Sequence, residues 1–376
     1  MGVFAALTLS QAGMVVHWRR LREEKPTWRR SAMVNGIGAT TTFIVLGIVF
    51  QTKFLEGGWM VVVAVPILVV AMNAIHRHYM GVRVQLRDPT RRPRQAEANH
   101  VVMLVGGPSE EERRAFWYSE QIRTSDFHAV HFAERNDPRG LEAMWARELG
   151  ILPTTPLLET LPMQGSLASS VRGYVARLRS RIPADDFVTV IVSERVKQGL
   201  VRRGTGRGFL LKLSLLFAPD VVVTNVPHVE GSMQEEALDK GSAIRHIVIV
   251  LVAAAHNASL TALEYAKTLS ADAIRAVHVV LDPEMSDHHE AEWEALDTGF
   301  PLEFIDAPYR ELGQTLREYV RPISLDGSTI VTVVLPEFVV RRWWHHLLHN
   351  QNAFDVKWTF LAEPDVMVTS VPYHLE

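Results

Sequence analysis

Two long uncharged apolar runs lie near the start of the chain. Met33 to Phe50 contains no charged residue, and neither does Trp59 to Ile75, which consists mainly of Val, Ile, Leu, Ala and Met. About 17 to 25 such residues in an α-helix cross the hydrocarbon core of a bilayer. The connection between them, Gln51 to Gly58, holds only two charged residues, Lys53 and Glu56. This pattern predicts a transmembrane helical hairpin.

Basic residues flank the outer ends of the predicted hairpin. His17 to Arg30 carries six Arg or Lys against two Glu, and His76 to Arg94 carries six Arg against one Asp. Lys and Arg are enriched on the cytoplasmic side of membrane proteins, so we expect both ends of the hairpin in the cytoplasm. The apolar residues Met1 to Val16 precede a basic cluster, the reverse of the order in a signal peptide. We interpret them as the second half of a further spanning helix, and the chain as the C-terminal part of a larger multi-pass protein whose upstream helices are missing here.

The rest of the chain contains an internal repeat. Ala218 to Pro227 and Glu363 to Pro372 agree at seven of ten positions. Other matches follow at nearly the same offset: His100–Leu104 with His246–Val250, Ala129–His131 with Ala276–His278, and Val188–Val190 with Val331–Val333. A repeat of this length predicts a duplicated domain, because each copy is long enough to close its own core.

The repeat divides the chain into three predicted parts. A membrane part covers 1–94, with a half helix, hairpin helices at 33–50 and 59–75 and a basic linker at 76–94. Copy one covers 95–240 and copy two covers 241–376.

Each copy alternates Val- and Ile-rich runs with helical patterns. In copy two, strand-like runs begin at Ile247, Ile274, Thr329 and Asp365, and Ser259 can cap a helix with apolar residues at i, i+3 and i+4. Continuous Val and Ile runs separated by helices are typical of a parallel sheet covered on both faces. The predicted fold class is therefore a membrane hairpin followed by α/β, with two tandem doubly wound parallel-sheet domains of about five strands each.

Composition limits the function classes. The chain has 39 basic and 42 acidic residues, which argues against a general nucleic-acid binder. Cysteine is absent, which excludes disulfides and thiolate chemistry and fits a reducing compartment. No Ser/His/Asp or paired-carboxylate spacing indicates catalysis, so we expect no enzymatic activity.

A glycine-rich basic loop near the end of copy one is the first candidate binding site. Backbone N–H groups at Gly204 and Gly206, beside Arg202, Arg203 and Arg207, could hold a phosphate. A solvated loop between a strand and a helix is the plainer interpretation. Contact of the three arginines with anionic lipid headgroups is a third.

Histidines suggest further candidates. His345 and His349 share a helical face, but no third ligand accompanies them, so we predict no metal site. His131 and His278 occupy matching strand positions and are expected in the core or at a dimer contact. Residues 288–290 are expected in a solvated loop.

Motifs in both parts resemble one family. In the membrane part these are Leu9–Met14, Trp28–Arg30, Thr52–Phe54, Gly58–Trp59 and Ile75–Tyr79. In the soluble part they are Asn257–Ser259, Pro308–Arg310, Leu335–Val339, Leu347–Gln351 and Val371–His374. Together they resemble the last helices and cytosolic tail of KUP-type potassium uptake permeases, in particular the KimA-like branch of the amino acid/polyamine/organocation superfamily. That tail is similar to universal stress proteins.

The resemblance implies a multi-pass protein of the cell (inner) membrane with cytoplasmic C-terminal domains. It implies proton-coupled potassium import by a homodimer that associates through the tail, and regulation by the tail. In some members a cyclic dinucleotide binds and inhibits, which makes the glycine-rich loop, together with His349 and Asn350, a candidate phosphate or cyclic-dinucleotide site. The family's ion-binding helices lie upstream, so no cation ligand is assigned, and this chain alone is not expected to transport.

The resemblance also bears on ATP. Stress-type ATP sites carry an Asp after the first strand and a glycine loop after the fourth. Here Val105–Pro108 and Val252–Ala255 contain no acid, and 341–351 replaces the loop in copy two, so ordinary ATP binding is not expected. Two alternative functions stay open: an amino acid permease of the same superfamily with a structural tail, and a membrane-tethered nucleotide-binding stress-type protein.

Overall fold

The computed structural model describes residues 2–23, 25–54, 59–88, 95–107, 109–122, 126–133, 157–196, 221–229, 245–324, 328–340, 351–361 and 365–375, with 141, 145, 215 and 363. The chain divides into two compact units, Met1–Arg83 and Val84–Glu376.

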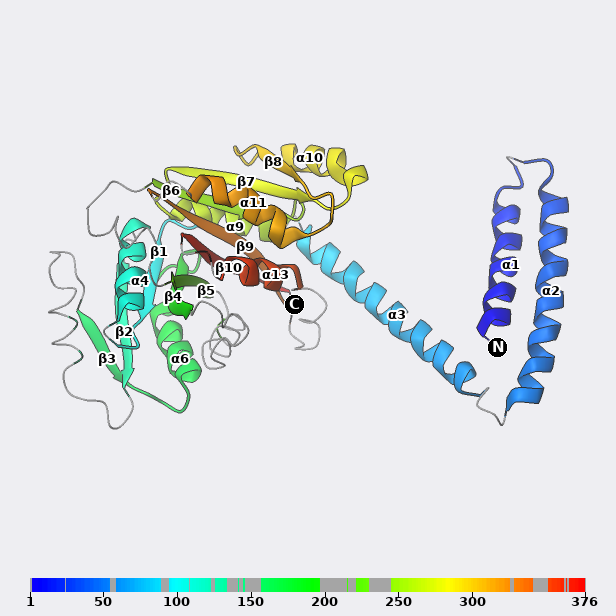
Figure 1. Ribbon diagram of the computed structural model, residues 1–376, viewed down its shortest axis with the longest axis horizontal. Coiled ribbons are helices and arrows are strands. Elements are labelled where there is room, and N and C mark those ends of the chain that lie inside the picture. The colour runs from blue at the N-terminus through cyan, green and yellow to red at the C-terminus, as the bar shows by residue number, and fades with distance from the viewer. Residues whose placement is uncertain are drawn as a thin grey trace. The chain divides into compact units, whose positions relative to one another are not determined.

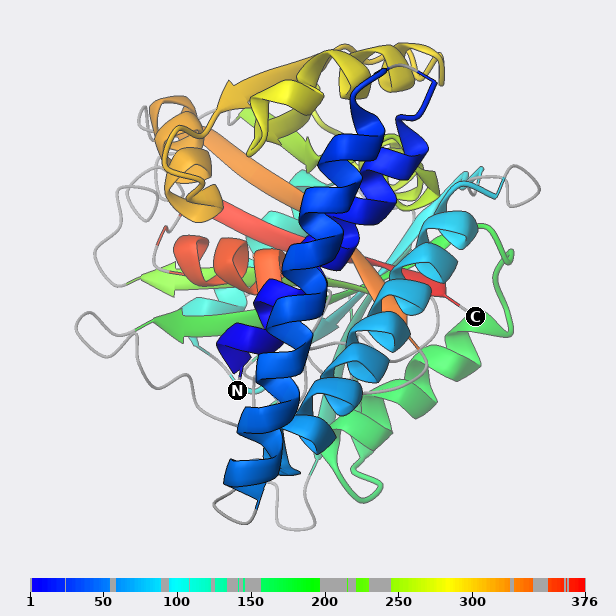
Figure 2. The ribbon, with the colours of Figure 1, turned by 90° about the vertical axis from the view of Figure 1, so that its right-hand side faces the viewer.

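The first unit is helical. It contains α1 (Gly2–Arg20), α2 (Trp28–Lys53) and most of α3 (Trp59–Leu86). Helices α1 and α2 lie side by side (Figures 1 and 2), and the Thr8 hydroxyl bonds to the Thr42 hydroxyl at 3.0 Å. Within the described part of the chain, one stretch is long and apolar enough to cross a bilayer, Trp28–Thr52 of α2. Several of its large apolar side chains, among them Met33, Ile37 and Phe43, are exposed, as on a helix that faces lipid.

Helix α3 continues beyond the second apolar run. It extends over 28 residues without a break, from Trp59 through the first part of the predicted basic linker to Leu86. The apolar run ends at Ile75, but a helix does not end where its side chains become charged, because Arg is a good helix former. The first part of the predicted linker, up to Leu86, is therefore helical.

The second unit is a layered α/β structure made by both copies. Copy one contributes β1 (Asn99–Leu104), α4 (Glu110–Gln121), β2 (Asp126–Ala133), β3 (Leu158–Pro162), α6 (Leu167–Arg179), β4 (Phe187–Val196) and β5 (Val221–Val229). Copy two contributes β6 (Arg245–Leu251), α9 (Asn257–Thr268), β7 (Ala273–Val280), η2 (Pro283–Met285), α10 (Ser286–Glu294), β8 (Leu302–Asp306), α11 (Leu312–Ser324), β9 (Thr329–Val340), α13 (Gln351–Phe360) and β10 (Val366–Leu375).

Ten strands of the described chain form a single sheet in the order β3-β2-β1-β4-β5-β10-β9-β6-β7-β8. Each half has the order third, second, first, fourth, fifth, and all neighbours within a half are parallel. This is a doubly wound arrangement. The predicted fold of two tandem doubly wound parallel sheets is confirmed, and the two sheets are also continuous with one another.

The halves join where β5 pairs antiparallel with β10. Thr224 lies opposite its equivalent, Thr369, and their hydroxyl oxygens are 2.8 Å apart. Equivalent residues that face one another mark a two-fold interface, here inside one chain. The repeated segment that revealed the duplication therefore forms the seam between the copies.

The strand register corrects one of the sequence matches. His100 pairs with Val188 of β4, and Ile247 pairs with Val331 at the equivalent position of β9. The predicted match of His100–Leu104 to His246–Val250 is therefore wrong by one residue. A slip of one residue in a strand moves every side chain to the other face, so the structural match decides which side chains correspond.

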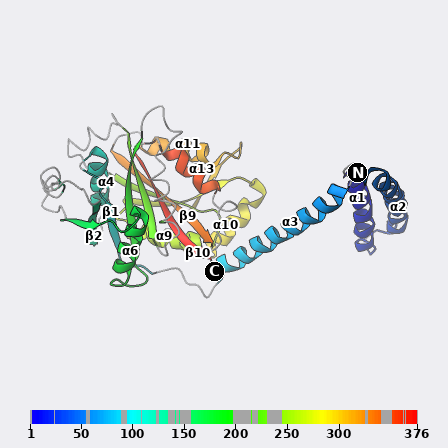
Figure 3. The same ribbon diagram turned by 90° about the horizontal axis from the view of Figure 1, so that it is seen from below.

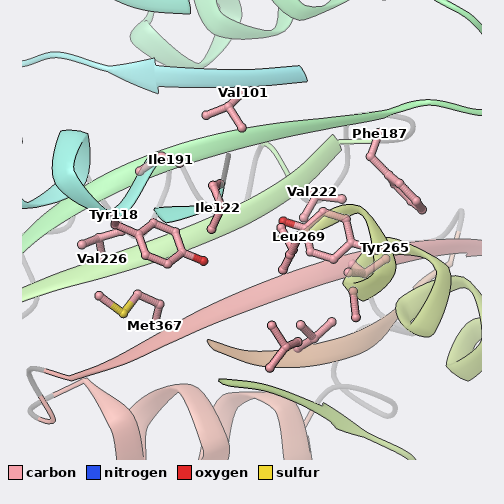
Figure 4. Packing of buried hydrophobic residues seen from close by; sticks show 14 of the residues in the cluster. Val101, Tyr118, Ile122, Phe187, Ile191, Val222, Val226, Tyr265, Leu269 and Met367 are labelled. Carbon is pink, nitrogen blue, oxygen red and sulfur yellow. The ribbon is translucent and has the colours of Figure 1, made fainter. Parts of the chain in front are cut away.

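Two tyrosines cross the seam in opposite directions. Tyr118 of α4 in copy one bonds to Thr332 of copy two at 2.9 Å, and Tyr265 of α9 in copy two bonds to Thr189 of copy one at 3.1 Å. Both rings are fully buried in the shared core (Figure 4). Each copy therefore completes the core of the other.

The corrected register makes Asn99 and His246 equivalent. Asn99 accepts a hydrogen bond from Thr189, and the Nε2 atom of His246 bonds to Thr332 at 2.8 Å. Burial lowers the pKa of His246 to about 4. Copy two thus holds a neutral imidazole where copy one has an amide.

The start of α9 differs from the expectation. Helix α9 begins at Asn257, and its cap is His256, whose Nδ1 atom accepts a hydrogen bond from the Ser259 backbone N–H at 3.2 Å. The predicted cap, Ser259, lies inside the first turn. Burial lowers the pKa of His256 to about 4, in keeping with its role as an acceptor.

Candidate functional site

A cavity of 340 Å³ opens at the carboxyl ends of β6, β7 and β9 in copy two. In doubly wound sheets, ligands bind beyond the carboxyl ends of the strands, where the first and fourth strands diverge. Here those strands are β6 and β9, and the volume lies in the range of small-molecule sites. The walls are mainly aliphatic, and the polar lining residues are His278, Asp282, His289 and Asn352.

A pair of histidines fixes the polar side of the cavity. The Nδ1 atom of His278 donates to the Val252 carbonyl at 2.7 Å, so its Nε2 atom accepts from the Nδ1 atom of His289 at 3.2 Å. Burial lowers the pKa of His278, which keeps this ring neutral. The predicted loop at 288–290 is wrong, because these residues belong to α10. The solvent exposure expected for His288 and Glu290 is confirmed, whereas His289 is half-buried and lines the cavity.

The equivalent histidine of copy one has the same partner. His131 is buried and bonds through Nδ1 to the Val105 carbonyl at 2.7 Å. Of the two roles expected for His131 and His278, the core role is confirmed. Each ring ties the second strand of its copy to the end of the first.

A second, more polar cavity of 560 Å³ adjoins the first and shares Leu281, Leu312 and Asn352 with it. Helices α11 and α13, which lie side by side (Figure 3), contribute to its wall. Arg310, at the start of α11, has a left-handed backbone φ of 56°. Such a conformation is costly for a residue other than glycine and tends to occur at functional positions.

In the first loop of copy one, the backbone N–H of Gly106 already has a carboxylate as its hydrogen-bond acceptor. The Gly106 backbone N–H donates to the Glu112 carboxylate at 3.0 Å, and Ser109 bonds to the same carboxylate. A carboxylate thus occupies the place where a phosphate would meet a backbone N–H. This contact was not predicted, although the spacing of Ser109 and Glu112 in the sequence matches a capping box.

The site residues predicted from the sequence are Arg202, Arg203, Gly204, Gly206, Arg207, His349 and Asn350, and all of them lie outside the described residues. In chain order, His349 and Asn350 fall between β9 and α13. Among the described residues, no group of three His, Asp or Glu side chains could hold a metal ion.

The end of α3 contacts the helix that lines the cavity. Arg87 forms an ion pair with Glu292 of α10 at 2.6 Å, and Asn257 of α9 donates to the Asp88 carbonyl at 2.9 Å. We call these four residues the linker contact. Glu292 lies one turn beyond His289 on α10, so one helix carries both the cavity wall and the linker contact.

The fold and this site define a tandem α/β tail domain that follows long apolar helices. A family model described as the KimA potassium transporter C-terminal domain matches residues 97–228 and 244–373, more than half of the chain. The chain belongs to this family.

The potassium transporter KimA of Bacillus subtilis (strain 168) is 21% identical to the chain over 378 residues. The alignment covers 100% of this chain and 37% of the transporter, so the chain spans little more than a third of that relative. Two solved structures from Pseudomonas aeruginosa also match, both with a TM-score of 0.46. One, a functionally unknown protein of strain PAO1, is 12% identical and covers 73% of this chain and 93% of its own. The other, of strain UCBPP-PA14 and described as a putative universal stress protein, is 15% identical. This match covers 74% of this chain and 94% of that protein.

Proposed function

We propose that the chain is the C-terminal part of a proton-coupled potassium importer, with a cytoplasmic regulatory tail. The observation that carries this proposal is the alignment with the Bacillus transporter over the whole chain, apolar helices included. In this proposal α2 and the first part of α3 form a membrane hairpin with both ends in the cytoplasm. In this proposal, helices upstream of this chain supply the ion pathway, so the chain alone does not transport. The proposed role of the tail is regulatory rather than enzymatic.

The tail is proposed to associate as a homodimer. Strands β5 and β10 are each paired on both sides within one chain, so neither strand is free to pair with a strand of a second protomer. The proposed dimer therefore uses another surface of the tail.

Regulation is proposed to start in the 340 Å³ cavity, with a cyclic dinucleotide as the ligand. The neutral histidines and aliphatic wall suit a nucleobase, and the adjoining polar cavity with Arg310 suits its phosphate. A ligand that moves His289 also moves α10, and with it Glu292 and the linker contact. Because α3 ends at that contact, ligand occupancy can bias the helix that leads to the membrane part.

Equilibrium binding to the full chain in detergent tests this site. We expect cyclic di-AMP to bind more tightly than ATP, and Ala253→Trp, which obstructs the cavity from its exposed rim, to weaken binding by about tenfold or more, about 1.4 kcal/mol. A triple variant, Arg202→Ala, Arg203→Ala and Arg207→Ala, shows whether the glycine-rich loop contributes.

The matched control is Ala184→Trp, which adds the same ring at an exposed turn of copy one. It should leave binding unchanged. If neither nucleotide binds, or if Ala253→Trp binds like the unmodified chain, the cavity is not the site. Tighter ATP than cyclic-dinucleotide binding would favour the stress-type alternative.

A further inference from the structure

Carboxylates and histidines alternate along the amino ends of the strands of copy one. His100 on β1 contacts Asp186 through Nε2 at 3.3 Å and Asp126 through Nδ1 at 3.1 Å. His128 on β2 contacts the same oxygen of Asp126 through Nε2 at 3.0 Å, and Glu159 of β3 through Nδ1 at 3.1 Å. We call these five residues the histidine–carboxylate clasp. The clasp links the first residues of β1, β2 and β3 to Asp186, which directly precedes β4.

The geometry of the clasp requires protons. An ionised carboxylate only accepts hydrogen bonds, and each imidazole of the clasp presents both ring nitrogens to carboxylate oxygens. With the three carboxylates ionised, all four bonds form only when both rings carry two N–H groups and a positive charge. Loss of one proton turns a charge-assisted bond into a contact between two lone pairs.

Among the described residues, three further polar groups of α6 lie beside the clasp. The Tyr174 hydroxyl donates to Glu159 at 3.1 Å, and Arg177 lies over the Tyr174 ring. Arg179 donates to the backbone carbonyl of Asp186 at 2.6 Å. These contacts go to a carboxylate, a ring and a backbone carbonyl rather than to a histidine nitrogen.

The His128 environment favours the charged ring. Burial works against the charge, but the hydrogen bonds to Glu159 and Asp126 outweigh it and raise the pKa of His128 above its ordinary value. The pKa of Asp126 is lowered: burial opposes this, and the hydrogen bonds to His100 and His128 cause it.

The clasp holds the first residues of copy one. Asp186 accepts hydrogen bonds from the backbone N–H groups of Glu97 at 3.2 Å and Ala98 at 3.1 Å. These residues directly precede β1, where the chain arrives from the linker. The orientation of the Asp186 carboxylate thus depends on His100 and also sets the position of this first segment.

Copy two lacks both histidines of the clasp and the carboxylate of Asp126. In the corrected register, Ile247 replaces His100, Ala273 replaces Asp126, and Arg275 replaces His128. Arg275 bonds to Tyr319 at 3.1 Å and approaches Glu303 at 3.8 Å. An arginine keeps its charge at every physiological pH, so this edge of copy two is fixed while that of copy one responds to protons.

We propose that the histidine–carboxylate clasp is a proton-operated switch that fixes the first segment of copy one at acidic pH and releases it as the pH rises. This goes beyond the proposed ligand site, because it needs no nucleotide and lies at the opposite ends of the strands. For His128, whose folded pKa is raised, the stabilising effect is fully present below the unfolded pKa of about 6.5 and is lost as the pH passes the raised value.

Hydrogen exchange of the full chain in detergent tests the switch between pH 6 and pH 9, after correction for intrinsic exchange. The Glu97 and Ala98 amides should exchange about tenfold faster, or more, at the upper pH, because release of the segment opens these hydrogen bonds to solvent. In the double variant His100→Gln with His128→Arg, neither introduced side chain titrates between pH 6 and pH 9, so this pH dependence of exchange should vanish. As a control, His288→Gln removes a histidine paired with Glu292 in copy two and should keep the unmodified profile.

Two results would overturn the switch. One is corrected exchange at Glu97 and Ala98 that is the same at pH 6 and pH 9 in the unmodified chain. The other is a pH dependence that persists in the double variant. If the double variant does not fold, the profile of the unmodified chain decides alone, because it contains the predicted step.

Discussion

Replacing Arg114 by Ala is expected to lower the free energy of unfolding by about 3–5 kcal/mol. Arg114 lies on α4 of copy one with a side chain only 2% exposed, and its Nη2 atom is 3.6 Å from Asp365, at the start of β10 in copy two. Its removal deletes a buried cation from beside a largely buried carboxylate. Because the pair joins the two copies, the loss should appear in the unfolding of both.

Arg113→Ala is the matched control for Arg114→Ala. Arg113 is the preceding residue, is about half exposed and pairs with Glu110 on the helix surface. Exposed ion pairs contribute about 0–1 kcal/mol, so this change should cost little. Urea unfolding of the full chain, followed by circular dichroism, measures both variants. Equal losses for the two variants would contradict a structural role of the Arg114–Asp365 pair.

Acid is expected to destabilise copy two strongly. Burial lowers the pKa of both His246 and His256 to about 4, whereas the unfolded value is 6.5. A histidine whose folded pKa is depressed contributes stability that is present above pH 6.5 and is lost as the pH falls towards 4. At pH 4, each ring should thereby lower the free energy of unfolding by up to about 3 kcal/mol. The sign is opposite to that of the clasp in copy one.

Copy one supplies the variants that test this acid effect. His246→Asn installs the residue found at the equivalent Asn99, and His256→Ser installs the helix cap found at Ser109. Neither replacement titrates between pH 4 and pH 7. In urea titrations at several pH values, the free energy of unfolding of the double variant should fall less between pH 7 and pH 4 than that of the unmodified chain. Unchanged acid sensitivity would mean that other groups cause it.

The sequence was sufficient for the fold class but not for the joining of the copies. Continuous Val runs such as Val221–Val223 report that a strand is buried on both faces, and this predicted parallel sheets correctly. The same runs do not say which strand lies next to which. The antiparallel contact of Thr224 with Thr369 links residues 145 apart, a pairing that no local pattern encodes.

Sites were harder to predict than strands for the same reason. His289 was expected in a solvated loop because its neighbours are acidic, but its partner His278 comes from another element, 11 residues earlier. The clasp joins His100 to Asp186 across 86 residues. Contacts of this kind depend on strand order and register, and an error of one residue in register hides them.

Potassium uptake by a longer chain that includes the proposed upstream helices, measured with and without residues 95–376, tests most directly whether this tail regulates transport. We expect the intact protein to import potassium and to be inhibited by cyclic di-AMP. The truncated protein, and the intact protein with Ala253→Trp, should keep importing but lose the inhibition. Absence of potassium uptake by the intact protein, or inhibition that is unchanged after removal of the tail, would contradict the proposal.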